Sequence, residues 1–135
     1  MQAVTETERA SRKWIWTGVI LSAIPIVLLI FSAVMKLLKP PPVLQGFARF
    51  GYPESLVVTL GIVELACAVL YAIPRTAVLG AILSTAYLGG AVATNVRIGD
   101  PTWPMPAVLG VLLWVGLYLR RPAIRREVPF RSGVL

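Results

Sequence analysis

The sequence predicts an all-α protein: a four-helix transmembrane bundle with a short interfacial segment between the first and second helices. Hydrophobic residues make up 57% of its 135 residues and charged residues only 14%, whereas a soluble domain carries about 25% charged residues. The apolar residues gather in four long runs, and a run of about 20 can cross a bilayer as a helix. A single domain, residues 1–135, accounts for this length.

The first spanning helix is predicted at residues 14–37. Its apolar run is longer than a signal-peptide core, so we expect it to be retained. The polar residues before it are expected to form a short, frayed tail. Mostly small or polar residues recur along the helix at helical spacing and predict its inward face: Gly18, Ser22, Pro25, Leu29, Ser32 and Lys36.

A short segment then separates the first two spans. Pro40, Pro41 and Pro42 end the first helix, and residues 43–53 are too few to cross a bilayer. Three apolar side chains there share one face of a short helix, which favours a helix lying at the membrane interface: Leu44, Phe47 and Phe50. The alternative is an ordinary connecting loop.

Three further spans are predicted, at residues 55–73, 76–97 and 104–120. The sequence Pro74-Arg75-Thr76 leaves a very tight turn between the second and third helices, so these two must be antiparallel neighbours. Pro104 and Pro106 stand in the first turn of the last helix, where a missing N–H costs little.

The basic residues predict the orientation of the chain. The formal net charge is +7, but the basic residues flank the apolar runs and form no nucleic-acid-binding module. Nine of the 13 lie at the amino end, at the turn after residue 73 or at the carboxyl end, and four lie on the other side. The positive-inside rule then predicts a multi-pass protein of the cell (inner) membrane with both termini in the cytoplasm.

Glu64 is the residue around which a candidate site can be drawn. It is the one carboxylate within the apolar run of residues 56–73, and a charge at that depth usually faces the bundle interior and pairs with a partner. Lys36 and Arg97 end helices on the same side of the membrane and are its candidate partners. The predicted polar cluster comprises Ser32, Lys36, Glu64, Tyr87, Thr94, Asn95 and Arg97. It is either a salt-bridge network that fixes helix packing or a pocket for a quinone, a lipid head group or a small anion.

The composition offers few catalytic groups. The chain has no histidine and a single cysteine, Cys67, in an apolar run. The commonest general base and metal ligand is therefore missing, and no redox pair of thiols can form. We predict no catalytic residue, no metal site and no cofactor-binding motif, and we expect no turnover by the chain alone.

Five short motifs resemble the DoxX-like family in order and spacing: SAVMKL (32–37), GIVEL (61–65), PRT (74–76), LGGAVATNVR (88–97) and WVGLYLR (114–120). The sequence departs from the family at Ala33, where glycine is frequent, and at Asn95, where histidine is frequent. The resemblance implies a small four-helix membrane protein. Relatives are linked to membrane redox complexes, including thiosulfate–quinone oxidoreduction and oxidative-stress assemblies.

Three functions remain open from the sequence. The first is an accessory or scaffold subunit of a membrane complex, with a redox protein complex and membrane lipids as partners. The second is a quinone- or lipid-binding oxidoreductase component that uses the pocket around Glu64. The third is a small transporter, which one carboxylate among four helices supports least. The sequence leaves the oligomeric state open.

The predicted topology can be tested by cysteine labelling. In a Cys67→Ser background, single cysteines at Thr5 and at Gly99 should react with a membrane-impermeant maleimide from opposite sides, because the positive-inside rule separates these sites. Labelling of both from the same side of sealed vesicles would contradict the four-span arrangement.

Overall fold

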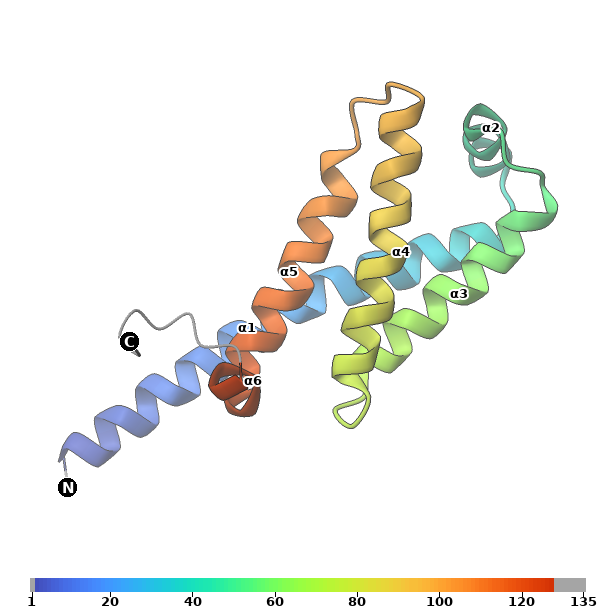
Figure 1. Cartoon of the computed structure of the whole chain (residues 1–135). Coiled ribbons are helices and arrows are strands. Elements are labelled where there is room, and N and C mark those ends of the chain that lie inside the picture. The colour runs from blue at the N-terminus through green and yellow to red at the C-terminus, as the bar shows by residue number, and fades with distance from the viewer. Residues whose placement is uncertain (1, 128–135) are drawn as a thin grey trace.

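The computed structural model of the chain describes residues 2–127, with side chains over residues 12–124 (Figure 1). All regular structure in this part is helical. The side chains of Arg9, Arg125 and Arg126, and the whole of Arg131, lie outside the described residues. The helices are α1 (Gln2–Leu38), α2 (Pro41–Phe50), α3 (Ser55–Ala72), α4 (Ala77–Arg97), α5 (Pro104–Arg120) and α6 (Pro122–Glu127).

The long helices have the length and polarity of membrane spans. Within the described residues, Arg12–Leu38 of α1, Ser55–Ala72 and Ala77–Arg97 are long and apolar enough to cross a membrane, and α5 is a shorter apolar helix. Large apolar side chains cover their outer faces: Trp16, Phe31 and Val111 are each more than 60% exposed. Such extended apolar surface belongs in lipid. An all-helical membrane protein is thus confirmed, and the fourth span stays a prediction.

Helix α1 begins earlier than predicted. It runs from Gln2, so the prediction of a frayed tail before residue 14 is wrong for the residues described. Alanine, glutamate, arginine and lysine are frequent in this stretch, and they are good helix formers. Because adding a residue to an existing helix is far easier than nucleating one, these residues prolong the packed part of α1.

The four long helices form a closed ring. Helix α1 packs against α3 and α5, and α4 packs against the same two helices, so α1 and α4 lie diagonally opposite each other. Figure 1 shows α2 and the α4–α5 loop at one end of the bundle, and the α3–α4 turn and α6 at the other. We call these the α2 end and the α6 end.

Close backbone contacts hold the α6 end together. A Cβ atom added to Gly80 of α4 would lie 2.2 Å from the backbone nitrogen of Tyr71 in α3. A Cβ atom added to Gly116 of α5 would lie 2.4 Å from the Ser22 hydroxyl of α1. Only a residue without a side chain lets helices approach so closely, so these glycines close the bundle at this end.

A buried tyrosine links three helices in the same region. The Tyr71 hydroxyl donates a hydrogen bond of 2.6 Å to the Leu113 carbonyl of α5 and lies 2.9 Å from the Ser22 hydroxyl of α1. The guanidinium of Arg120 lies 4.8 Å from the centre of the Tyr71 ring and donates to the Tyr71 carbonyl at 3.2 Å. The inward face predicted for α1 is found here, with Gly18, Ser22, Pro25 and Leu29 all buried.

The short segment after α1 is a helix and not a loop. Helix α2 begins with prolines in its first turn and ends at Gly51, which has a φ of 80°, a backbone conformation that glycine adopts without cost. Phe47 on its apolar face is buried, and Leu44 and Phe50 are half-buried. This face is therefore turned toward the bundle.

The packing at the α6 end predicts a large difference between two glycines of α4. Gly80→Ala forces the backbones of α3 and α4 apart and should cost about 1–3 kcal/mol or more. Gly90→Ala should be neutral or slightly stabilising, because a Cβ atom there meets nothing within 4 Å and alanine favours the helix. Melting temperatures of the two variants in one detergent make the test, and equal values would contradict this packing.

Candidate functional site

A cavity of about 830 Å³ lies at the α2 end of the bundle. It fills the space between the diagonal helices α1 and α4, and α2, α3 and α5 complete its wall. Most of its lining is apolar, including Leu29, Phe47 and Leu109. Its polar lining comes from Ser32, Lys36, Tyr52, Glu64, Tyr87, Thr94 and Asn95. Six of the seven residues of the predicted polar cluster therefore line one cavity.

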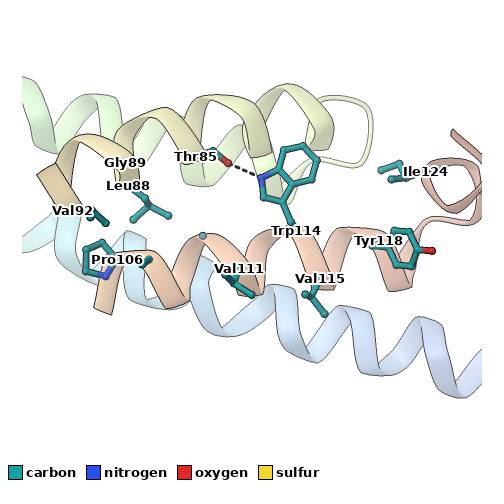
Figure 2. A pocket seen from close by; sticks show the side chains of 12 residues that line it. Thr85, Leu88, Gly89, Val92, Pro106, Val111, Trp114, Val115, Tyr118 and Ile124 are labelled. Atoms are coloured by element: carbon teal, nitrogen blue, oxygen red, sulfur yellow. Dashed lines mark hydrogen bonds between the residues drawn. The ribbon is translucent and has the colours of Figure 1, made fainter. Parts of the chain in front are cut away.

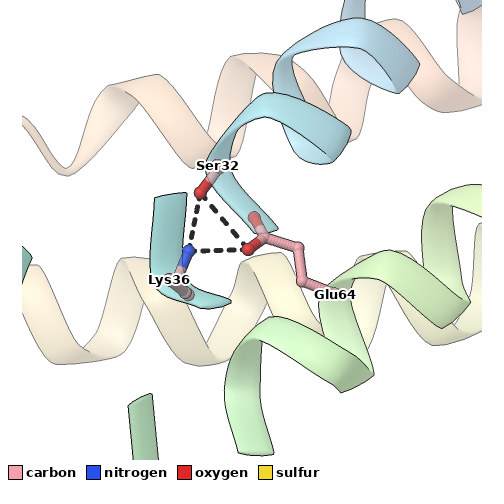
Figure 3. Close-up of polar contacts among 3 residues, drawn as sticks. All are labelled: Ser32, Lys36 and Glu64. Atoms are coloured by element: carbon pink, nitrogen blue, oxygen red, sulfur yellow. Dashed lines mark hydrogen bonds and ion pairs between the residues drawn. The ribbon is translucent and has the colours of Figure 1, made fainter. Parts of the chain in front are cut away.

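An ion pair stands in the wall of this cavity. The Lys36 ammonium lies 2.6 Å from Oε2 of Glu64, and the two side chains are 13% and 4% exposed. Lys36 also donates to the Ser32 hydroxyl at 2.6 Å, and Ser32 donates to the same Glu64 oxygen at 3.2 Å. Figure 3 shows the closed triangle that results, with two corners on α1 and one on α3. The pairing of Glu64 with Lys36 is thus found in the structure.

Close packing of α1 and α3 allows the short distance between the Lys36 ammonium and the Glu64 carboxylate. A Cβ atom added to Gly61 would lie 3.0 Å from Cβ of Lys36 and 3.2 Å from the Ala33 carbonyl. Gly61 precedes Glu64 by three residues, so both share one face of α3. Ser32 and Lys36 likewise lie one turn apart on α1. The two helix faces meet at Gly61 and bring the charged groups into direct contact.

Tyr87 lies on the opposite side of the cavity, on α4. It lines the cavity, and its side chain interacts with the Glu64 carboxylate. Glu64 is therefore approached from α1 by Lys36 and Ser32 and from α4 by Tyr87. Among the described residues, these contacts leave the carboxylate well supplied with donors, as a buried charge requires.

Thr94 and Asn95 line the cavity about two turns further along α4 than Tyr87. The Thr94 hydroxyl donates to the Gly90 carbonyl at 2.9 Å and lies 2.8 Å from the Tyr52 hydroxyl. Since one hydroxyl has a single proton, Tyr52 is the donor of that second bond. The side-chain amide of Asn95 makes no hydrogen bond within the part of the chain that the structure describes. Asn95 therefore brings an unused hydrogen-bonding group to the cavity.

Arg97 lies apart from the ion pair. Its guanidinium donates to the Phe50 carbonyl at the end of α2, and it does not line the cavity. The structure corrects the prediction that Arg97 joins the polar cluster. Arg97 stands about half a helical turn beyond Asn95, so its side chain contacts α2 and not Glu64 of α3. Among the residues that the structure describes, Lys36 is the one cation in the cavity lining.

Helix α2 covers the cavity and is tied to the end of α4. The rings of Phe47, Phe50 and Tyr52 lie 6.1–6.3 Å apart, and all three residues line the cavity. Besides the Arg97–Phe50 and Tyr52–Thr94 contacts, Arg49 lies 3.4 Å from Asp100 in the α4–α5 loop. We call this covering segment, residues 41–52, the α2 lid.

The charge on Asp100 is stabilised locally. Hydrogen bonds from the Thr102 hydroxyl and backbone N–H lower the pKa of Asp100 below its usual value, and the Arg49 guanidinium acts in the same direction. Asp100 therefore stays ionised to a lower pH than an aspartate without these hydrogen bonds. The Arg49–Asp100 contact is lost only when the pH drops below that lowered pKa.

A family comparison decides what kind of protein carries this site. The model of the DoxX-like family matches residues 20–116, well over half of the chain. The chain belongs to the DoxX-like family. The match takes in Ser32, Lys36, Glu64 and the cavity-lining part of α4, as the motifs in the sequence suggested. Comparisons with curated proteins and with solved structures gave no match.

Sequence reasoning missed the α2 lid as part of the site of this DoxX-like protein. The spacing of Phe47 and Phe50 signalled an apolar face but not what the face covers. Tyr52 and Thr94 are 42 residues apart, and no local pattern predicts such a contact. Cys67 is buried, as the apolar run predicted. The described residues contain no group of three or more acidic or cysteine side chains placed to hold a metal.

The ion pair predicts that, in a double-mutant cycle, a single substitution at Glu64 destabilises the protein more than the double substitution of Glu64 and Lys36. Glu64→Gln leaves the Lys36 ammonium buried without its counter-charge and should cost about 3–5 kcal/mol. Adding Lys36→Met should recover much of that loss, because two neutral side chains then replace the pair. Melting temperatures in detergent give the comparison.

Arg49→Gln is the control for this cycle. It breaks the other ion pair of the described residues, but Arg49 is 68% exposed, so the melting temperature should hardly change. If Glu64→Gln is as mild as Arg49→Gln, the Lys36–Glu64 pair does not carry the packing of α1 on α3.

Proposed function

We propose that this DoxX-like protein binds a small neutral molecule of the quinone class in the α2-end cavity. In this role it is an accessory component of a membrane redox complex and turns over no substrate alone. The proposal rests on one observation: a cavity of about 830 Å³, mostly apolar, with hydrogen-bonding groups gathered around a closed ion pair. Sites for small organic ligands have this size and this mixture of walls.

The ion pair favours a neutral ligand over an anion. The charge of Lys36 is offset by Glu64 at 2.6 Å, and Arg97 is engaged outside the cavity. An anion would enter a site of nearly zero net charge and lose its hydration without a new counter-charge, which is costly in an apolar setting. A neutral carbonyl compound avoids that cost.

Two groups are placed to hold a carbonyl oxygen. An ammonium group has three N–H donors, and the contacts of Lys36 with Glu64 and Ser32 account for two of them. The amide of Asn95 is a second donor without a partner among the described residues. The apolar side chains around them would exclude water from the ring. A bound quinone supplies the redox chemistry, and these residues bind and orient it.

The accessory role follows from what the chain contains. It has no histidine and one cysteine, and Cys67 is buried in an apolar helix interface, where a thiol is inert. Among the described residues, no pair of thiols and no metal-binding cluster stands beside Lys36 to pass electrons to a ligand. Electrons for a bound quinone must therefore come from a partner protein.

The transporter alternative has less support. A transport path needs access from both sides, but the α6 end is closed by the contacts of Gly80 with Tyr71 and of Gly116 with Ser22. The hydrogen bonds of Tyr71 cross the bundle axis just there. The cavity is thus a pocket with one closed end.

Binding of a short-tailed benzoquinone to the purified protein tests the proposal. Calorimetric titration should give saturable binding, and Asn95→Leu should weaken it about three- to tenfold, the value of one hydrogen bond. Gln45→Leu is the matched control: it makes the same change on the exposed side of α2, away from the cavity, and should leave the affinity unchanged.

The same preparation separates the proposal from its rivals. Inorganic phosphate and sulfate should not compete with the quinone, since the described residues that line the cavity include no unpaired cation. The protein alone should show no thiosulfate- or thiol-dependent quinone reduction. Absence of quinone binding, or competition by the anions, would falsify the binding function, and steady reduction by the lone chain would make it an enzyme.

A further inference from the structure

A second hollow lies beside the cavity, between α4 and α5. This α4/α5 groove has a volume of about 760 Å³ and is lined by residues of α4, α5 and Ile124 of α6. Its walls are apolar apart from three side-chain polar groups. Two of these are paired with each other: the indole N–H of Trp114 donates to the Thr85 hydroxyl at 2.7 Å (Figure 2). The groove thus presents a surface that suits hydrocarbon.

The groove and the cavity meet at two residues. Leu88 of α4 and Pro106 of α5 line both hollows. Two consecutive residues of α4 lie on different sides of this junction: Gly89 lines the groove, and Gly90 lines the cavity. A molecule that occupies both hollows must therefore pass Leu88 and Pro106.

The glycines leave both hollows open. A Cβ atom added to Gly89 or Gly90 would meet nothing within 4 Å, and one added to Gly110 would meet only a methyl group of Leu88 at 3.8 Å. This contrasts with Gly80 and Gly116, where an added Cβ collides with the neighbouring helix. The glycines near the junction therefore make room and do not bring helices together.

We propose that the α4/α5 groove binds the hydrocarbon tail of the same molecule whose polar head lies in the α2-end cavity. The ligand class is then a neutral lipid with a carbonyl-bearing head and a long alkyl or isoprenoid tail. This inference rests on the proposed function and extends it. The adjacency of the two hollows at Leu88 and Pro106 supports it, together with the change from a partly polar to an apolar lining across that junction.

Van der Waals packing against the groove, and not the hydrophobic effect, would supply the affinity for a lipid tail. Lipid tails are as apolar as the groove, so packing against a fixed surface is the source of any preference in a membrane. The preference therefore depends on the shape of the groove. Filling it with a side chain should remove the tail site and leave the head site intact.

Two neighbouring glycine variants and two probes form the test, all with the full chain in lipid nanodiscs. Gly89→Leu fills the groove and should leave the binding of a short-tailed benzoquinone unchanged, but weaken a long-tailed benzoquinone tenfold or more. Gly90→Leu fills the cavity and should weaken both probes. Gly110→Leu, which fills the groove from α5, should repeat the result of Gly89→Leu. Melting temperatures identify any variant that fails to fold.

Photolabelling distinguishes the ligand tail from an ordinary bilayer lipid. A long-tailed benzoquinone with a diazirine at the tail end should label α5 between Val111 and Val115, and excess short-tailed quinone should prevent this labelling by displacing the head. A phospholipid with a diazirine in its acyl chain should label α5 weakly and without such competition.

Each outcome decides a different claim. If the short-tailed quinone does not bind the natural protein, the proposed function fails. If it binds but Gly89→Leu leaves the long-tailed probe unaffected, the tail site fails and the head site stands. If labelling of α5 by the long-tailed probe resists competition, the groove holds acyl chains independently of the cavity, and the inference is overturned.

Discussion

The ion pair between Lys36 and Glu64 joins α1 to α3 and forms part of the wall of the cavity. A single charge at bilayer depth costs about 2.5–3.5 kcal/mol on insertion scales, and more on others, so Glu64 requires a cation within the protein. Lys36 supplies it at 2.6 Å, and Gly61 allows α1 and α3 to approach closely enough for that distance. The pair fixes how these two helices face each other and thereby sets one wall of the cavity.

The helices pack closely at the α6 end of the bundle and leave a cavity at the α2 end, and the glycines differ accordingly between the two ends. At the α6 end, Gly80 and Gly116 let backbones touch, and the Tyr71 hydroxyl joins α1, α3 and α5. Near the α2 end, Gly89 and Gly90 have no neighbour within 4 Å of an added Cβ. The ring of four helices therefore narrows toward α6 and leaves space between α1 and α4, which the α2 lid covers. The closest backbone contacts between helices and the cavity therefore lie in different halves of the molecule.

The sequence predicted the elements better than the contacts between them. Long apolar runs predict membrane-spanning helices. A single carboxylate within such a run predicts a buried ion pair, so Glu64 and its candidate partner Lys36 could be identified from the sequence. The choice between Lys36 and Arg97 could not, because it depends on how α4 is rotated. The same holds for the α2 lid: Phe47 and Phe50 mark an apolar face, yet the contact of Tyr52 with Thr94 joins distant parts of the chain. Sequence spacing orders side chains along one helix and does not place one helix against another.

We infer that Glu64 is an ionised partner of Lys36, so that the cavity is neutral and accepts a neutral ligand. Infrared difference spectroscopy of the natural protein against Glu64→Gln measures the state of this side chain directly. At neutral pH we expect the bands of an ionised carboxylate to disappear in the variant, and a short-tailed quinone to leave them in place. A band of a protonated carboxylic acid assigned to Glu64 would contradict this ion pairing, because an unpaired Lys36 would then make the cavity a site for anions.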